Sequence, residues 1–341
     1  MFTRSRSARV PWSWALLLCS LLSFCTCIAA QEPPQRRLVP GVGFNLAHDY
    51  GTASVHHANS TVAHIVKIEG SPAYKQFMRG HSAASPQPQS ALCPRLIASI
   101  PLLDAICQPS QLPSSGADAA KPMIRALKAS VEAYLGTTFC FADVAIPATL
   151  SADQNAAICD ALAADGLQTA LPNPINAALA AAVANGIESD DERVLLAVDY
   201  SRSGLAAMLL TQELGVFDEL RHDAWPELGD DFAPLDPRHW DLVRATLANF
   251  LRESDRSAGV DDLVSYGDRA EERQFREALR DVLGRTQGQA EGAMFDPIFA
   301  SAAGVADASF NVMDDPGFSK KPFWGCRWRS ALYRDSSEAE L

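Results

Sequence analysis

The sequence predicts an α/β fold with mixed sheets, and three observations lead to this prediction. Near the N-terminus, three short strand-like runs are separated by turn-forming residues, which is typical of an antiparallel meander. Further along, strand-like runs alternate with segments of helical spacing, which favours parallel pairing. The 341 residues, 48% of them hydrophobic, suffice for one large domain or for two lobes with separate cores.

The first half of the chain supplies most of the predicted strands. We expect strands over residues 39–46, 53–57, 62–68 and 139–146, and helices over 123–135, 155–164 and 176–185. Ser151 is a suitable N-cap for the second helix, and Gly136 and Gly166 are suitable ends for the first two. The Ser-, Pro-, Gln- and Ala-rich stretch 82–122 predicts a loop-rich insertion.

The second half opens on an apolar hairpin over residues 194–210, with a polar turn in its middle. After it we expect a linker to Phe232, a helix over 237–253, a strand over 263–266, and helices over 271–283 and 296–308. Residues 311–341 are polar and form the predicted tail. Two interpretations of this tail stay open: a docking patch, or a segment that covers an exposed face or is disordered. Its basic residues and tryptophans are Lys320, Lys321, Arg327, Arg329, Trp324 and Trp328.

The first thirty residues have the features of a secretory signal peptide. Three arginines precede the apolar run 12–28, and Ala29 and Ala30 offer a cleavage site. Residues 31–40 form a polar lead-in. The alternative is an uncleaved membrane anchor, because the apolar run approaches spanning length. A signal peptide predicts a protein of the secretory pathway, secreted or kept in the endoplasmic reticulum lumen, with no membrane association after cleavage.

The cysteines and one sequon extend this prediction. Five cysteines lie beyond residue 30, at positions 93, 107, 140, 159 and 326. Cys93 and Cys107 flank one apolar segment and are the natural disulfide pair in an oxidising compartment. We expect Cys140 and Cys159 to be buried as small hydrophobic residues. Asn59 begins an Asn-Ser-Thr glycosylation sequon.

Charge and residue spacing exclude two other classes of partner. The formal net charge is −12 and no basic stripe stands out, so we expect no nucleic-acid partner. His56 and His57 are adjacent on a predicted strand and point to opposite faces, so we expect no metal site there.

Several short motifs, taken in order, resemble the nucleotide-binding domain of the 70-kDa heat-shock chaperones (DnaK-type). Residues 131–136 are similar to the family's A-E-A-Y-L-G, 144–148 to V-x-V-P-A, 175–187 to I-N-E-P-T-A-A-A-I-A-Y-G-L, and 228–232 to L-G-G-E-D-F. Residues 261–267 resemble the strand before G-G-S-T-R, and 296–306 follow N-P-D-E-A-V-A-Y-G-A-A. The resemblance covers about residues 41–308.

The resemblance implies a two-lobed α/β fold of the actin-like ATPase (ribonuclease-H-like) type. Lobe I would span residues 41–187 and lobe II 188–310. Only a few residues lie between Phe250 and Val260, where the family carries the subdomain that closes over the base. After Ala308 we expect neither the family's interdomain linker nor its peptide-binding domain. The fold would therefore lack most of the base-closing subdomain and the entire peptide-binding domain.

The same resemblance implies a nucleotide cleft formed by two phosphate-binding hairpins, in which this sequence departs from the family. In the first hairpin the metal-side aspartate is Asn45, and the glycine-threonine turn is Ala47-His48-Asp49. In the second, Asp199 is retained but most of the glycines after it are replaced. The candidate cleft residues are Asn45, His48, Asp199, Ser201, Arg202, Ser203, Gly204, Gly267 and Asp268. Two roles stay open: Asp199 is either a remnant or a residual ligand contact, and the Arg202 guanidinium is a candidate replacement for lost N–H donors to a phosphate.

These departures predict a non-catalytic pseudo-ATPase of the secretory pathway, a binding or regulatory module for an unidentified protein partner. We assign no catalytic residue and no metal ligand. One alternative is a residual ATP- or ADP-binding protein, with Mg²⁺ and weak ATPase activity. Another is a secreted interaction protein or effector that acts through the 82–122 insertion or the 311–341 tail.

Overall fold

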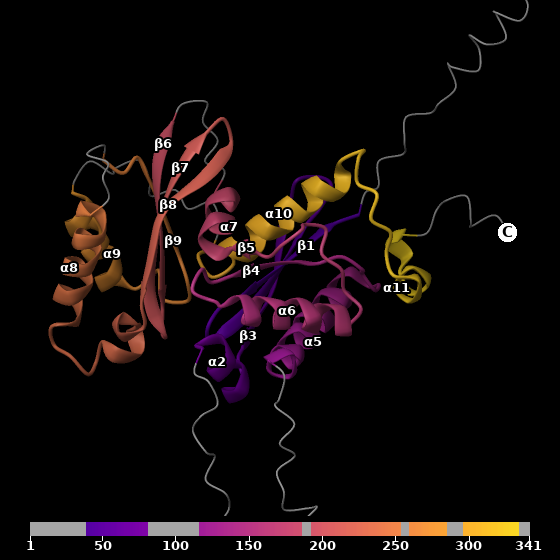
Figure 1. Ribbon diagram of the computed structural model, residues 1–341, viewed down its shortest axis with the longest axis horizontal. Coiled ribbons are helices and arrows are strands. Elements are labelled where there is room, and N and C mark those ends of the chain that lie inside the picture. The colour runs from indigo at the N-terminus through magenta and orange to yellow at the C-terminus, as the bar shows by residue number, and fades with distance from the viewer. Residues whose placement is uncertain (1–38, 81–115, 186–191, 254–258, 285–295, 334–341) are drawn as a thin grey trace, which may run out of the picture. The chain divides into compact units, whose positions relative to one another are not determined.

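Two β-sheets organise the chain, which is represented by a computed structural model describing residues 39–80, 116–185, 192–253, 259–284 and 296–333 (Figure 1). The first sheet has the order β3-β2-β1-β4-β5. Its strands are β1 (Gly41–Leu46), β2 (Tyr50–His56), β3 (Val62–Glu69), β4 (Asp143–Ile146) and β5 (Ile175–Asn176). The first three strands pair antiparallel and the last two join in parallel. The mixed α/β class expected from the sequence is confirmed.

One face of the first sheet is apolar and carries helices. They are α2 (Pro72–Met78), α5 (Gly116–Leu135) and α6 (Ala152–Ala164), the last capped by Ser151 as expected. Phe44 and Val55 of the sheet pack in one core with Leu127 of α5. α5 begins at Gly116 rather than near Met123, because Ala117 and Ala120 are also buried in this core and extend the helix past Pro122. The last residues of the expected loop-rich insertion 82–122 are therefore helical.

The second sheet has the order β8-β7-β6-β9. Its strands are β6 (Arg193–Ser201), β7 (Gly204–Glu213), β8 (Val216–Trp225) and β9 (Asp262–Tyr266). The β6–β7 hairpin is confirmed, whereas the expected linker before Phe232 is wrong, since β8 lies there. Leu214 and Gly215 have φ of 50° and 77° and make the tight β7–β8 turn. β8 is charged and largely exposed, so it lacks the apolar pattern that marks a buried strand.

Short helical elements complete the second sheet. Single turns η2 (Pro226–Leu228) and η3 (Asp230–Phe232) follow β8, then come α8 (His239–Arg252) and α9 (Arg273–Leu283). Val198 of β6 packs in one core with Val243 of α8 and Phe275 of α9. Both helices lie within two residues of their predicted bounds at each end.

Two helices of small residues, α7 (Ala177–Ala184) and α10 (Ala300–Asp314), lie beside each other near β1 (Figure 1). A Cβ on Gly43 of β1 would lie 2.2 Å from the Ala302 carbonyl oxygen, and one on Gly304 would lie 1.8 Å from that of Ala180. Only hydrogen atoms fit at these crossings, so the small residues set how closely the elements approach. α10 ends six residues beyond the predicted Ala308, and the expected tail therefore starts inside this helix.

A disulfide joins Cys140, just before β4, to Cys326 of the short helix α11 (Trp324–Arg329), which the turn η4 (Ala331–Tyr333) follows. Cys140 is buried as expected, but the expectation that it acts only as a small hydrophobic residue is wrong, because it is bonded to Cys326, which is also buried. Cys159 is a free, half-buried thiol. The expected Cys93–Cys107 pair, like the expected signal peptide, lies outside the described residues.

Two further expectations concern surface and membrane. Asn59 of the sequon is exposed in the β2–β3 turn, where the Thr61 backbone N–H and hydroxyl donate to its side-chain oxygen at 3.1 and 2.6 Å. Among the described helices, none combines the length and apolar character that crossing a bilayer requires.

Candidate functional site

The turn of the β6–β7 hairpin and the residues after β9 meet at one point. Gly267 follows β9 with φ of +108°, a conformation that glycine adopts readily. A Cβ at this position would lie 2.3 Å from Asp199 Oδ1 and 2.5 Å from the Tyr200 carbonyl oxygen. Gly267 therefore lets the chain pass directly beside the end of β6, and it brings Asp268 to the hairpin turn.

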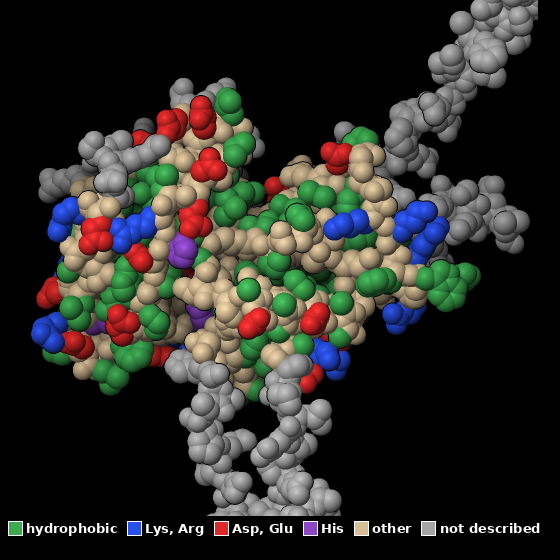
Figure 2. Space-filling view, viewed as in Figure 1, with side chains coloured by type: hydrophobic (Ala, Val, Ile, Leu, Met, Phe, Trp, Pro, Cys, Tyr) green, Lys and Arg blue, Asp and Glu red, His purple; other side chains and the backbone are tan. Residues whose placement is uncertain are grey.

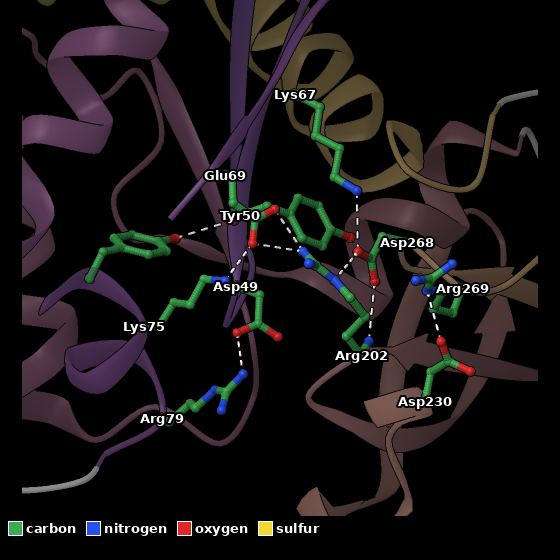
Figure 3. Close-up of polar contacts among 11 residues, drawn as sticks. Asp49, Tyr50, Lys67, Glu69, Lys75, Arg79, Arg202, Asp230, Asp268 and Arg269 are labelled. Carbon is green, nitrogen blue, oxygen red and sulfur yellow. Dashed lines mark hydrogen bonds and ion pairs between the residues drawn. The ribbon is translucent and has the colours of Figure 1, made fainter. Parts of the chain in front are cut away.

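The Asp268 carboxylate is held by three donors (Figure 3). The Arg202 backbone N–H donates to Oδ1 at 3.2 Å, and the Arg202 Nε donates to Oδ2 at 2.9 Å. The Lys67 ammonium, on β3 of the other sheet, lies 3.2 Å from Oδ2. The Asp268 side chain is 4% exposed. A hairpin N–H, a guanidinium and an ammonium are donors typical of a bound anion, and here a carboxylate of the protein itself takes them.

Arg202 continues this arrangement to the other sheet. Its Nη2 lies 2.9 and 2.7 Å from the two carboxylate oxygens of Glu69, which also accepts from the Lys75 ammonium of α2. Partial burial of the Glu69 carboxylate acts to raise its pKa. The hydrogen bonds from Arg202 and Lys75 outweigh this effect and hold the pKa of Glu69 below its usual range. We call Lys67, Glu69, Lys75, Arg202 and Asp268 the cross-sheet network, because it ties the β6–β7 turn to β3.

The first hairpin turn, between β1 and β2, has its own buried ion pair. The Asp49 carboxylate, whose side chain is 3% exposed, accepts from Arg79 at the C-terminal end of α2. The Tyr74 hydroxyl donates to the Ala47 carbonyl oxygen at 2.8 Å, which fixes the turn against the same helix. His48 Nε2 lies 3.4 Å from the Thr149 hydroxyl, and burial lowers the pKa of His48.

The pKa of Asp199 depends on carboxylates near both hairpin turns. Burial above all, and then the Asp268 and Asp49 carboxylates, raise the pKa of Asp199 to about 7, although the Ser201 hydroxyl that donates to Oδ1 acts to lower it. Near neutral pH this carboxyl therefore gains and loses its proton.

The sheet face that carries Lys67 also holds buried polar side chains. Lys67 Nζ lies 4.5 Å from the centroid of the Tyr50 ring, which is 1% exposed. Asn45 and Thr52 face each other across β1 and β2. Their Oδ1 and Oγ1 atoms are buried and have no hydrogen-bond partner within the described part of the chain.

The negative charge of this arrangement opposes the addition of a phosphate group. The Asp49 and Asp268 carboxylates both act electrostatically on Asp199, and a bound phosphate would add further negative charge beside them. The Arg202 guanidinium, considered above as a phosphate ligand, is bound by Asp268 and Glu69 instead. In the described ranges no group of three or more His, Cys, Asp or Glu side chains is placed to hold a metal ion.

The structure brings together part of the predicted cleft. Asp199 and Ser201 touch, and Arg202 touches Asp268. Gly267 lies against both Asp199 and Ser201. Ser203 and Gly204 complete the same turn, while Asn45 and His48 lie on the first hairpin.

Four residues of the site were missed by the sequence analysis: Lys67, Glu69, Lys75 and Arg79. The predicted strand 62–68 contains Lys67 but ends one residue before Glu69, so it did not show that these two side chains share a face of the observed strand β3. Nothing in the local sequence indicated which residues they meet.

Part of the sequence is similar to a known protein family. The family model described as Hsp70 protein matches residues 115–232, about a third of the chain, from α5 to the end of η3. This chain carries an Hsp70-like nucleotide-binding domain. No curated protein matches the sequence significantly.

The matched range of the Hsp70-like domain contains the β6–β7 hairpin, and the first hairpin lies outside it. Mixed sheets with α7 and α10 between them agree with an actin-like ATPase-type fold. Nine residues separate the end of α8 at Arg252 from the start of β9 at Asp262, too few for a subdomain.

Proposed function

We propose that this Hsp70-like domain is a non-catalytic pseudo-ATPase that acts as a binding or regulatory module. The observation that carries the proposal is the Asp268 carboxylate, which holds the backbone N–H of the hairpin turn together with Arg202 and Lys67. An internal anion on these donors competes with a phosphate for the same place.

Phosphoryl transfer depends almost entirely on positioned cations and donors, so this substitution has a direct chemical consequence. Asn45 stands where the family has an acidic group on the metal side, and Asp49 adds a carboxylate to the turn beside it. Removing one positioning group of this kind costs about a hundred- to a thousandfold in rate. Several such losses together support the absence of turnover.

The location we propose is the secretory pathway, either outside the cell or in the endoplasmic reticulum lumen. The buried Cys140–Cys326 disulfide supports this location, since such bonds persist mainly in oxidising compartments. The exposed sequon at Asn59 is accessible for modification there. The partner we propose is a protein.

Calorimetric titration with ATP and ADP, with and without Mg²⁺, tests the proposal on the purified chain. We expect no saturable heat at millimolar nucleotide. The resemblance implies that Gly267 and Asp268 stand where the family motif G-G-S-T-R has two glycines. The variant Asp268→Gly removes the internal anion and gives that glycine pair, so we expect it to gain measurable binding. Micromolar binding by the wild type, with hydrolysis that Asp199→Ala abolishes, would contradict the proposal.

A second candidate, residual nucleotide binding, is favoured by one specific observation. The unpartnered Asn45 Oδ1 and Thr52 Oγ1 lie on the sheet face that also carries Lys67, and Thr52 and Lys67 are register partners. Buried polar atoms without partners are costly, and a ligand that bonds to them recovers that cost. This candidate predicts that ADP raises the melting temperature of the wild type, because a ligand that binds only the native state stabilises it.

A further inference from the structure

The surface of α11 combines exposed aromatic rings with basic side chains. Trp324 and Trp328 are 76% and 67% exposed, and Phe323 beside them is 47% exposed. The two indole rings meet edge to face, with centroids 5.7 Å apart. Figure 2 shows hydrophobic side chains projecting next to Lys and Arg at the end of the molecule where Figure 1 places α11. We call Phe323, Trp324, Trp328 and the neighbouring Lys320, Lys321, Arg327 and Arg329 the α11 patch.

The rings project from a rigid base. Cys326, between the two tryptophans, is bonded to Cys140. On either side, the Phe323 N–H donates to Gln168 Oε1 at 3.0 Å and the Ala331 N–H donates to Thr137 Oγ1 at 3.0 Å. Within this segment Cys326 and Ser330 are buried, whereas the two tryptophans face outward. Of the two roles open for this segment, an outward-facing surface is the one that its exposed rings support.

The charge of the patch opposes that of the chain. Four Lys and Arg residues lie within ten positions, in a protein whose formal net charge is −12. Within the patch, the Lys320 ammonium donates to the Thr169 and Ala170 carbonyl oxygens, each at 3.1 Å. Because charges are screened over about 8 Å at physiological salt, an anionic surface that touches the patch is influenced mainly by these cations.

We propose that the α11 patch docks on an anionic lipid surface, with Trp324 and Trp328 in the interfacial layer and the cations among the headgroups. Indole rings favour this layer because one end of the ring is apolar and the other is a hydrogen-bond donor. Basic side chains next to them attract anionic headgroups. The rings stand out from the surface, a shape that a soft bilayer accommodates and that a protein partner matches only with pockets. This proposal replaces the expectation of no membrane association after cleavage.

Co-sedimentation with vesicles of phosphatidylcholine, with and without phosphatidylserine, tests the proposal on the purified chain. We expect binding only to the anionic vesicles, with a blue shift of tryptophan fluorescence. The variant Trp324→Ala/Trp328→Ala is expected to lose at least tenfold in affinity. Each reversal in Lys320→Glu/Lys321→Glu should weaken binding by at least the factor of about five that one basic residue contributes.

Matched controls use equally exposed residues elsewhere. Leu235 is 76% exposed, and the Arg238 side chain is 77% exposed, so Leu235→Ala and Arg238→Glu repeat the chemical changes away from α11. We expect both to bind like the wild type. No binding to anionic vesicles, or equal losses in the controls, would overturn the proposal. Tryptophan-dependent binding to polyglutamate without vesicle binding would overturn it in favour of an acidic protein partner.

Discussion

The two hairpin turns of the site have similar ion pairs, but these pairs hold different parts of the fold together. Each places a buried carboxylate beside an arginine, at a place where the Hsp70 resemblance implies a phosphate-binding turn: Asp49 with Arg79, and Asp268 with Arg202. The two carboxylate side chains are 3% and 4% exposed. Arg79 comes from a helix packed on the same sheet, whereas Arg202 and Lys67 belong to different sheets. The first pair therefore stabilises a turn locally, and the second joins the two sheets.

The comparison shows why the position of an ion pair matters more than its burial. Breaking the local pair is expected to loosen the β1–β2 turn alone. Breaking the cross-sheet network removes contacts of β3 with the β6–β7 turn and leaves two cations without their buried partner. Variants of each pair and of the residues around them test this distinction.

Asp268→Ala should give the largest loss of stability. It leaves Arg202 and Lys67 without the carboxylate between them, and removing one partner of a buried pair costs about 3–5 kcal/mol. Urea denaturation measures the change. The control is Glu277→Ala, which removes a carboxylate 51% exposed and 3.6 Å from Arg273, and should leave the unfolding midpoint unchanged. A loss for Asp268→Ala no larger than that of the control would show that the network carries no stability.

Gly267→Ala should cost roughly 2–3 kcal/mol, because it combines an unfavourable positive φ with a clash against the end of β6. Gly325→Ala is the matched control, since a Cβ there meets no atom within 4 Å. Thermal unfolding of both variants checks the expectation. If Gly267→Ala melts like the wild type, the close passage beside Asp199 is not what fixes Asp268.

Asp199→Asn should alter the pH dependence of stability. The pKa of Asp199 is about 7 in the folded protein, against about 3.9 for an unfolded aspartate. Between these values the folded state retains a proton that the unfolded state has lost. Stability therefore falls as pH rises through this window, by up to roughly 1.4 kcal/mol per pH unit.

Asparagine does not titrate, so the free energy of unfolding of the variant should rise relative to that of the wild type from about pH 4 to pH 7. Above that range the difference should stay constant. Urea denaturation at a series of pH values measures this difference. Parallel curves for the two proteins would mean that the Asp199 carboxyl titrates normally.

Arg79→Ala should have the smallest effect, a loss of about 1–2 kcal/mol, because the Arg79 side chain is 37% exposed and water partly replaces it beside Asp49. Hydrogen exchange should show faster exchange in the β1–β2 turn and no change in the β6–β7 turn. Faster exchange in both turns would contradict the distinction between a local and a cross-sheet pair.

The parts of the fold that the sequence predicted are those set by local rules. The β6–β7 hairpin follows from two apolar runs around a polar turn, and α6 follows from Ser151 and the helical spacing after it. β8 was missed because it is an exposed edge strand, for which alternating burial gives little signal.

The site was less predictable, because its contacts join residues far apart in the sequence. Lys67 and Asp268 are 201 positions apart, and Glu69 and Arg202 are 133 apart. The resemblance to the 70-kDa heat-shock chaperones implied that the cleft had lost its glycines, but only the fold shows that the new charges meet one another. The same holds for Cys140, whose partner Cys326 lies 186 positions away.

The Cys140–Cys326 disulfide also makes part of the chain a covalently closed ring. Cys140 and Cys326 close a ring that contains the whole second sheet, α7 and α10. A single proteolytic cut anywhere within the ring leaves both fragments attached until the bond is reduced. In the chain-entropy model, closing a ring of this length raises the free energy of the unfolded chain by roughly 5 kcal/mol. As long as its surroundings stay oxidising, the protein thus resists unfolding and stays in one piece after a single cut.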